Sequence, residues 1–104
     1  MIAAQSITTA DNEHVRITTW TFGAEGAATG QHRHGFDYVV VPVTDGTFTV
    51  TDVDGSVHEM TQTAGSPYLG TAGTAHDVAN ATGQAAVFVE VELKSWAGSS
   101  GSVD

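Results

Sequence analysis

The chain has 104 residues, which is enough for one domain with a buried core. Twelve Asp and Glu residues against three Lys and Arg residues give a formal net charge of -9, which excludes a basic nucleic-acid-binding surface and attraction to anionic membranes. Cysteine is absent, so disulfides, thiolate chemistry and Cys-type zinc sites are excluded as well.

The first strong strand pattern covers residues 14–22, where β-branched and aromatic residues dominate. A second strand pattern covers 37–43. Its Pro42 has no N–H to donate to a ladder, so we expect this residue at an edge, a bulge or a strand end. The Asp-Gly pair at 45–46 is a strong turn signal and predicts a hairpin into a strand over 47–51.

Further turn signals divide the second half of the chain. The Asp-Gly pair at 54–55 predicts another hairpin into a strand over 56–60, and the last strand is expected over 86–93. Between them, short strands are expected near 67–71 and over 75–80. No window of about 11 residues has a helical period. Many short strands between Gly-rich turns predict an all-β sandwich or barrel.

We expect a single domain over residues 1–95 and a flexible Gly/Ser-rich tail over 96–104. The N-terminal residues lack the basic region and the apolar stretch of a signal peptide. No run approaches the roughly 18 apolar residues of a membrane span. The expectation is therefore a cytoplasmic protein without a membrane or nucleic-acid partner.

Three histidines are the strongest candidates for a functional site. In the His-x-His pair of His32 and His34, both imidazoles would point to one face of a strand, because side chains alternate with period two. His76, from a distant strand, would complete a site of three nitrogen ligands with open positions for substrate or water. The alternative is a polar pair on a solvated strand face.

The chain resembles small single-domain cupins over roughly residues 13–93. The first cupin motif is a glycine, His-x-His, a glutamate and a second glycine, and it is matched by Gly26, His32, His34 and Gly46. The second motif is matched by Gly65, Gly73, His76 and Asn80. Two departures stand out: counting six residues back from Gly46 puts the glutamate position at Val39, and Thr71 replaces a proline.

The resemblance implies a double-stranded β-helix, or jelly-roll barrel, with His32, His34 and His76 around one divalent metal ion (Fe, Mn, Ni or Zn). It is closest in kind to compact cupins of the β-alanine degradation type, and small cupins of this sort often form homodimers. With Val39 in place of the glutamate, three neutral imidazoles leave the full charge of the ion on the site. Such a centre favours anionic or bidentate oxygen ligands.

The leading hypothesis is a metal-dependent enzyme acting on a small oxygen-rich metabolite of the carboxylate or diketone type. Three-histidine cupins include diketone and thiol dioxygenases, so the resemblance implies an oxidoreductase (a dioxygenase) or a lyase. The alternative is a metal- or ligand-binding cupin without catalysis, acting as a sensor or accessory protein. A third reading is a metal-free barrel whose histidines bind an anion.

Three further side chains are candidates for moving protons near the metal. Tyr38 and Tyr68 are potential proton donors, although aromatic residues on strands more often belong to a core. Asp37 shares strand parity with Val39 but lies about 6–7 Å along the strand. It would therefore bind the metal only through a bulge; otherwise it would orient His34 or a water, or face solvent in a turn.

Overall fold

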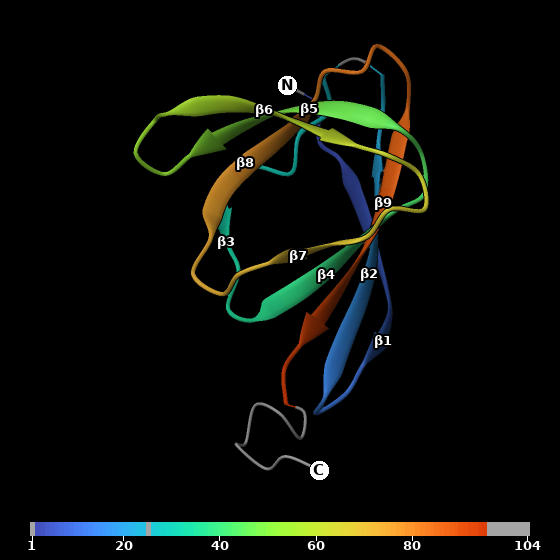
Figure 1. Ribbon diagram of the computed structural model, residues 1–104, viewed down its shortest axis with the longest axis vertical. Helices are drawn as coiled ribbons and strands as arrows, with labels where there is room; N and C mark the ends of the chain where they lie inside the picture. The colour runs from blue at the N-terminus through green and yellow to red at the C-terminus, as the bar shows by residue number, and fades with distance from the viewer. Residues whose placement is uncertain (1, 25, 96–104) are drawn as a thin grey trace.

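A computed structural model describes residues 2–24 and 26–95 of the chain (Figure 1). The tail expected over 96–104 lies outside the described residues. Within them the structure is built from strands alone, so it contains no helix that is long and apolar enough to cross a membrane. The strands are β1 (Gln5–Asp11), β2 (Val15–Phe22), β3 (His32–Arg33), β4 (Asp37–Pro42), β5 (Gly46–Asp52), β6 (Val57–Gln62), β7 (Tyr68–Gly70), β8 (Ala75–Asn80) and β9 (Ala86–Leu93).

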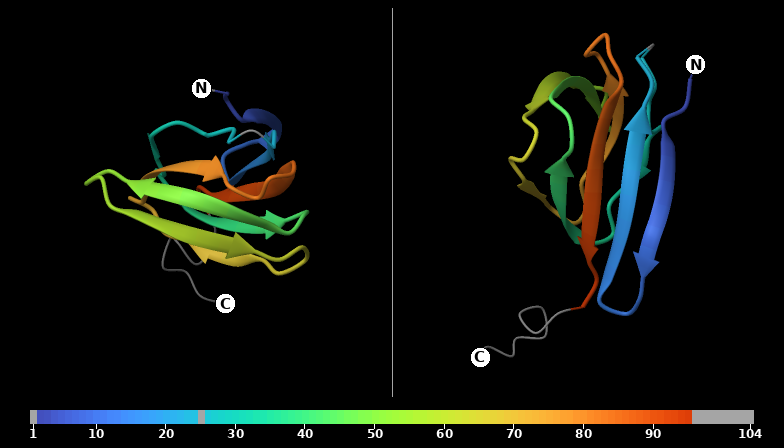
Figure 2. Two further views of the ribbon diagram at one scale, coloured as in Figure 1. Left: turned by 90° about the horizontal axis from the view of Figure 1, so that it is seen from above. Right: turned by 90° about the vertical axis from the view of Figure 1, so that its right-hand side faces the viewer.

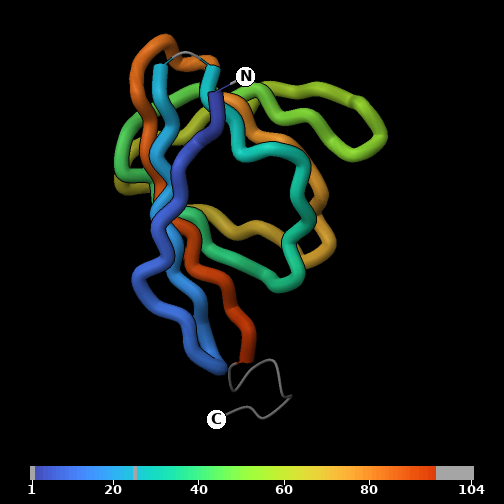
Figure 3. Tube along the Cα trace, turned by 180° about the vertical axis from the view of Figure 1, so that it is seen from behind, coloured from blue at the N-terminus to red at the C-terminus, as the bar shows by residue number. Residues whose placement is uncertain are grey.

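Two antiparallel sheets face each other across the core. One has the strand order β1-β2-β9-β4-β7 and the other β3-β8-β5-β6. Figure 2 shows the long strands β1, β2 and β9 side by side, with the second sheet beside them. Figure 3 shows the two sheets from behind. Phe22 and Phe88 of the first sheet pack on Phe48 of the second, and their ring centroids lie 5.1–5.8 Å apart. These three rings belong to the hydrophobic core between the two sheets.

The predicted all-β jelly roll is confirmed, and most predicted strands lie within one or two residues of their observed bounds. Pro42 is the last residue of β4, where no ladder bond from its nitrogen is needed. The Asp54-Gly55 hairpin is also confirmed, because β5 pairs with β6 and Gly55 adopts a φ of 89°, in the left-handed region that glycine tolerates.

Two strand predictions need correction. The Asp45-Gly46 turn does not form a hairpin, because β4 pairs with β7 and β9 whereas β5 pairs with β6 and β8. The turn therefore carries the chain from one sheet to the other. Strand β1 was not predicted; it is almost entirely exposed, and it forms as an edge strand through its backbone pairing with β2.

Candidate metal centre

Backbone pairing brings the three histidines together. Strand β3 pairs with β8 so that His32 lies directly opposite His76. His34 follows just beyond β3, and its N–H donates to the Thr74 carbonyl at 2.8 Å. The Gly73 N–H in turn donates to the His34 carbonyl at 2.8 Å, which a φ of 92° at this glycine accommodates. The loop before β8 therefore fixes His34 relative to His76.

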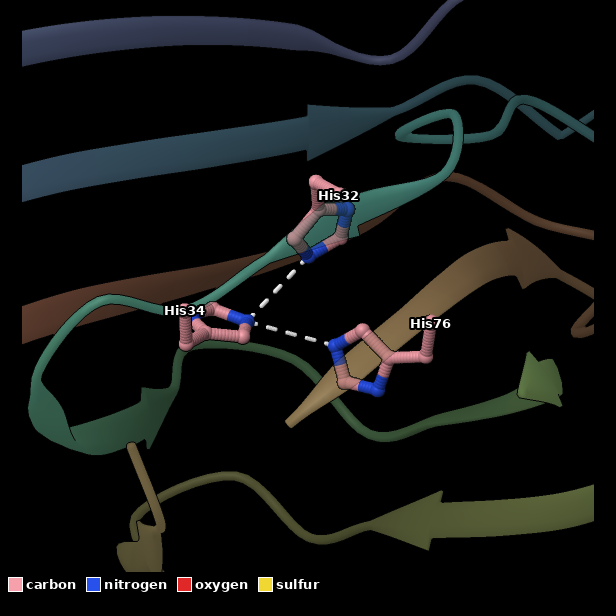
Figure 4. A group of neighbouring side chains, drawn as sticks. All are labelled: His32, His34 and His76. Carbon is pink, nitrogen blue, oxygen red and sulfur yellow. Dashed lines mark hydrogen bonds between the residues drawn. The ribbon is translucent and has the colours of Figure 1, made fainter. Parts of the chain in front are cut away.

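The ring nitrogens converge on one point (Figure 4). The Nε2 atom of His34 lies 3.1 Å from that of His32 and 3.2 Å from that of His76. The Nδ1 atom of His32 lies 2.8 Å from the Gly30 carbonyl, which can only accept. His32 therefore carries its proton on Nδ1, and the lone pair of its Nε2 faces the other two rings.

The surroundings keep two of these rings neutral. His34 is 6% exposed. Burial, reinforced by the neighbouring His32 and His76, lowers the pKa of His34 to about 4. Burial and the His32 ring also lower the pKa of His76. Neutral imidazole is the form that binds a metal ion, so near neutral pH the rings of His34 and His76 present free lone pairs rather than charge.

The donor set fits a single divalent transition-metal ion. Nitrogens bound to one ion at about 2.0–2.1 Å lie about 3 Å from each other in tetrahedral or octahedral geometry, which matches the separations of the His34 Nε2 atom from the other two. All three potential ligand atoms lie within 4.8 Å of one another. His32, His34 and His76 are the group of potential ligands found among the described residues. The three histidines chosen from sequence spacing are therefore brought together, with His34 one residue outside the strand expected to carry it.

Comparison with known proteins shows the family to which the chain belongs. The chain is 50% identical over 84 residues to the beta-alanine degradation protein BauB of Pseudomonas aeruginosa, and the match covers 81% of this chain and 86% of BauB. It superimposes on the crystal structure of a cupin domain from Bordetella pertussis with a TM-score of 0.85 and 38% identity, covering 90% of this chain and 96% of that one. This chain belongs to the cupin superfamily.

A more distant structure shares the fold alone. A double-stranded β-helix protein from Klebsiella pneumoniae matches with a TM-score of 0.71 at 16% identity, over 88% of this chain and 77% of that one. No family model matches the chain. Membership of the superfamily does not by itself determine the function of this chain, which depends on the residues of its own site.

Tyr38, not Val39, occupies the glutamate position of this cupin. The Tyr38 ring stacks on the His34 imidazole, with centroids 3.9 Å apart and an interplanar angle of 17°. Val39 points to the opposite face of β4, where it pairs with the exposed Leu69. The prediction that Val39 takes the glutamate position is therefore wrong, and Val39 does not line the metal centre. Three residues separate His34 from Tyr38, which is a spacing that the cupin motif allows between its second histidine and its glutamate. Seven residues separate Tyr38 from Gly46, one more than the motif has, and the extra residue lies in the turn after β4.

Asp37 lies away from the histidines. It is exposed at the start of β4, on the same outward face as Val39, and its carboxylate accepts a hydrogen bond from the Ala72 N–H at 2.8 Å. Of the three roles considered for Asp37, metal ligation and the orientation of His34 or a water do not fit this position, and neither does proton transfer at the centre. The carboxylate braces the loop between β7 and β8 instead.

A small cavity of about 40 Å³ adjoins the centre. Its lining comes from both sheets: Tyr38, Val40, Met60, Tyr68, His76, Val78, Phe88 and Glu90. The Tyr68 hydroxyl lies 3.6 Å from the Met60 sulfur, and burial raises the pKa of Tyr68 to about 12. Burial also raises the pKa of Tyr38. Both tyrosines therefore reach the cavity as neutral hydroxyls.

Glu90 is the residue that sequence reasoning missed. Glu90 lines the cavity, and its carboxyl accepts a hydrogen bond from the Trp20 indole N–H at 3.2 Å. Burial raises the pKa of Glu90 to about 7, against the lowering effect of the Trp20 hydrogen bond. One signal was present in the sequence: Glu90 shares strand parity with the core residue Phe88, so both side chains fall on one face of β9.

Proposed function

We propose that this cupin binds one divalent metal ion (Fe, Mn, Ni or Zn) through His32, His34 and His76, and that it is a metal-dependent enzyme. The observation that carries the proposal is the convergence of three ring nitrogens within 4.8 Å of one another, with the His34 Nε2 atom 3.1 and 3.2 Å from the other two and neutral rings favoured at His34 and His76. When bound, the ion would act as a Lewis acid or oxygen activator toward an oxygen-bearing ligand. A dioxygenase or a lyase reaction is consistent with this site.

The substrate we propose is a small carboxylate or a comparable molecule with two oxygens. The cavity beside His76 measures about 40 Å³, room for only a few heavy atoms. The name of the Pseudomonas relative refers to the degradation of β-alanine, a short carboxylic acid. Three neutral imidazoles leave an ion with its full charge, which favours such an anion.

The residues around the histidines have separable tasks in this proposal. The Gly30 carbonyl holds the His32 ring in one tautomer, and the Tyr38 ring holds the plane of His34 by stacking. Tyr68 presents a neutral hydroxyl to the cavity, where it can orient a ligand oxygen or donate a proton. Val40, Val78 and Phe88 exclude bulk water from the cavity walls.

One observation favours a second candidate function, a non-catalytic sensor or accessory protein that binds metal or ligand. A cavity of about 40 Å³ is small beside the roughly 300–1,000 Å³ of ordinary ligand pockets. Metal binding without turnover is the outcome expected of this second candidate.

We also propose that the protein works in the cytoplasm as a homodimer joined through the outward face of the five-stranded sheet. Leu69, Val39, Val91 and Ile17 are successive cross-strand neighbours on that face. Leu69 is 77% exposed, so the row of apolar side chains is open to solvent at one end. A second copy would cover it. Leu69→Lys is expected to convert a dimer to a monomer in sedimentation-velocity runs, and wild-type protein that sediments as a monomer would refute the dimer.

The metal proposal is tested by elemental analysis of protein purified without chelators or a nickel column. We expect about one equivalent of a single metal per chain, and loss of that metal in His76→Gln. His14→Gln is the matched control, because His14 is an exposed residue in the turn between β1 and β2. An activity screen with small carboxylates and diketones, with oxygen uptake recorded, then separates an enzyme from a binding protein. Protein that binds none of the four metals would refute the proposal.

A further inference from the structure

We propose that Glu90 is the proton-exchanging residue of the cavity: its carboxylate takes a proton from a hydroxyl group (an alcohol or enol oxygen) of the small ligand bound at the three histidines, and returns it later. This inference rests on the proposed function. It adds a proton acceptor to the site. The two tyrosines cannot act as bases near neutral pH, because both are neutral hydroxyls.

Position is the first support. Glu90 lies in the middle of β9, between Thr18 of β2 and Val40 of β4 in the ladder. Its carboxyl and the His76 ring both line the same cavity of about 40 Å³. The cavity has room for only a few heavy atoms, so a ligand that extends into it from His76 lies close to Glu90. This shared cavity is what places Glu90 beside a ligand bound next to His76.

The hydrogen bonding of Glu90 is the second support. Among the described residues, its carboxyl has one hydrogen-bond partner, the Trp20 indole N–H on Oε1. The neighbouring cation, Arg16, is already engaged: its Nε and Nη2 donate to the two carboxylate oxygens of Glu92 at 2.6 and 2.7 Å. Glu90 is thus a carboxyl in a cavity without an ion-pair partner, which is an expensive arrangement for a purely structural residue.

The charged and titratable groups around Glu90 explain why it can hold a proton. They are Arg16 on β2, Glu92 on β9, Tyr38 on β4, Tyr68 on β7 and His76 on β8. Burial is the main cause that raises the pKa of Glu90 to about 7, and the Glu92 charge adds to it. The Trp20 hydrogen bond and the Arg16 charge act in the opposite direction. Both protonation states are consequently populated near neutral pH.

The proposed step is a proton transfer from the ligand to Glu90. A ligand oxygen loses its proton as the O–H bond breaks, and that proton forms a new O–H bond on the Glu90 carboxylate. The electron pair of the broken bond stays on the ligand oxygen, which then faces the histidines as an anion. Negative charge moves from Glu90 toward the three histidines, and no oxidant or other co-reactant is needed.

Proton counting tests the step with a readout other than turnover. The probe is acetohydroxamic acid, a small neutral molecule with two oxygens that loses a proton when it binds to a metal centre. Titration calorimetry of the metal-loaded protein in two buffers of different ionisation enthalpy gives the number of protons released. At about pH 8, where Glu90 is about 90% ionised, the wild-type protein should release fewer than about 0.3 protons per ligand.

At about pH 6, Glu90 already carries its proton, so the wild-type protein should release about one proton per ligand. Glu90→Gln, which preserves shape and an acceptor for Trp20, should release about one proton at both pH values. Glu59→Gln is the matched control, since Glu59 is exposed on β6, and it should behave as the wild type. Equal proton release by Glu90→Gln and the wild type would overturn the inference and leave the proposed function standing.

A second measurement needs no variant that folds and no ligand that binds. The carboxyl carbon of Glu90, followed by ¹³C NMR in the wild-type protein, should titrate with a midpoint near pH 7. A midpoint below about 5, the range of an ordinary glutamate, would overturn the inference. If the metal-loaded protein does not bind the probe at all, the proposed ligand site itself is refuted and the inference falls with it.

Discussion

Gly70→Ala is predicted to dislodge Tyr38 from the metal centre. A Cβ atom at Gly70 would lie 2.0 Å from the Tyr38 Cζ atom and within 2.4 Å of both Cε atoms. Ordinary contact begins near 3.4 Å, so the ring has to retreat by about 1.4 Å. Because the same ring stacks on His34 with centroids 3.9 Å apart, a shift of that size changes the stack as well.

The expected cost follows from these contacts. Overpacking in a core costs about 1–3 kcal/mol, and a lost aromatic stack about 0.5–1.5 kcal/mol. A total near 3 kcal/mol corresponds to a fall in melting temperature of about 12–24 °C for a domain of this size. Metal affinity should fall by about 10–100-fold, since Tyr38 orients the His34 ring. Melting curves and metal titrations measure the two effects.

Gly35→Ala is the matched control. Gly35 adjoins His34 in sequence and does not have a positive φ, and a Cβ atom added there would have no other atom within 4 Å. Its substitution should change stability by less than about 0.5 kcal/mol. If Gly70→Ala melts at the same temperature as Gly35→Ala and binds metal equally well, the Tyr38 ring is not confined as described, and the reasoning from this close approach fails.

Four further predictions follow from the site. His76→Gln should weaken metal binding by more than about 100-fold in calorimetry, because it removes a ligand and not merely a partner of one. Val39→Glu should leave metal affinity unchanged, since Val39 faces away from the histidines; tighter binding would contradict the observed register. Metal-free protein should lose stability between about pH 6.5 and pH 4, because the unfolded chain takes up a proton at the histidine that His34, with its pKa of about 4, refuses in the fold. Melting curves with and without metal check this loss, and the added gain from metal should also disappear by about pH 5. Glu90→Gln should be more stable than the wild type above about pH 7, because the fold disfavours the ionised form of the Glu90 carboxyl, and the two should differ little near pH 4. Equal melting temperatures at about pH 8 would refute this cost of burial.

Local sequence determined the parts of this protein that depend on backbone period and spacing. Period-two alternation located the strands from Val15–Phe22 to Ala86–Leu93, because side-chain direction in a strand follows from the backbone itself. The His-x-His spacing placed His32 and His34 on one face for the same reason. The spacing of both cupin motifs also identified His76, which the ladder brings directly opposite His32.

Tertiary structure decided everything that depends on which elements lie opposite each other. Asp45-Gly46 has the same local turn signal as Asp54-Gly55, yet it connects two sheets, because its flanking strands find long-range partners elsewhere. Local spacing also could not decide whether Tyr38 or Val39 takes the glutamate position. The motif reaches Tyr38 when it is counted from His34 and Val39 when it is counted back from Gly46, and the stacking of Tyr38 on His34 decides for Tyr38.

Glu90 shows the same limit most clearly. On β9 the valines alternate with Phe88, Glu90 and Glu92, and by local pattern the glutamates belong on a solvated face. The fold reverses that assignment, since the second sheet covers the glutamate face and leaves the valines on the outside. A strand's sequence fixes which residues share a face, but only the packing of the other sheet fixes which face is buried.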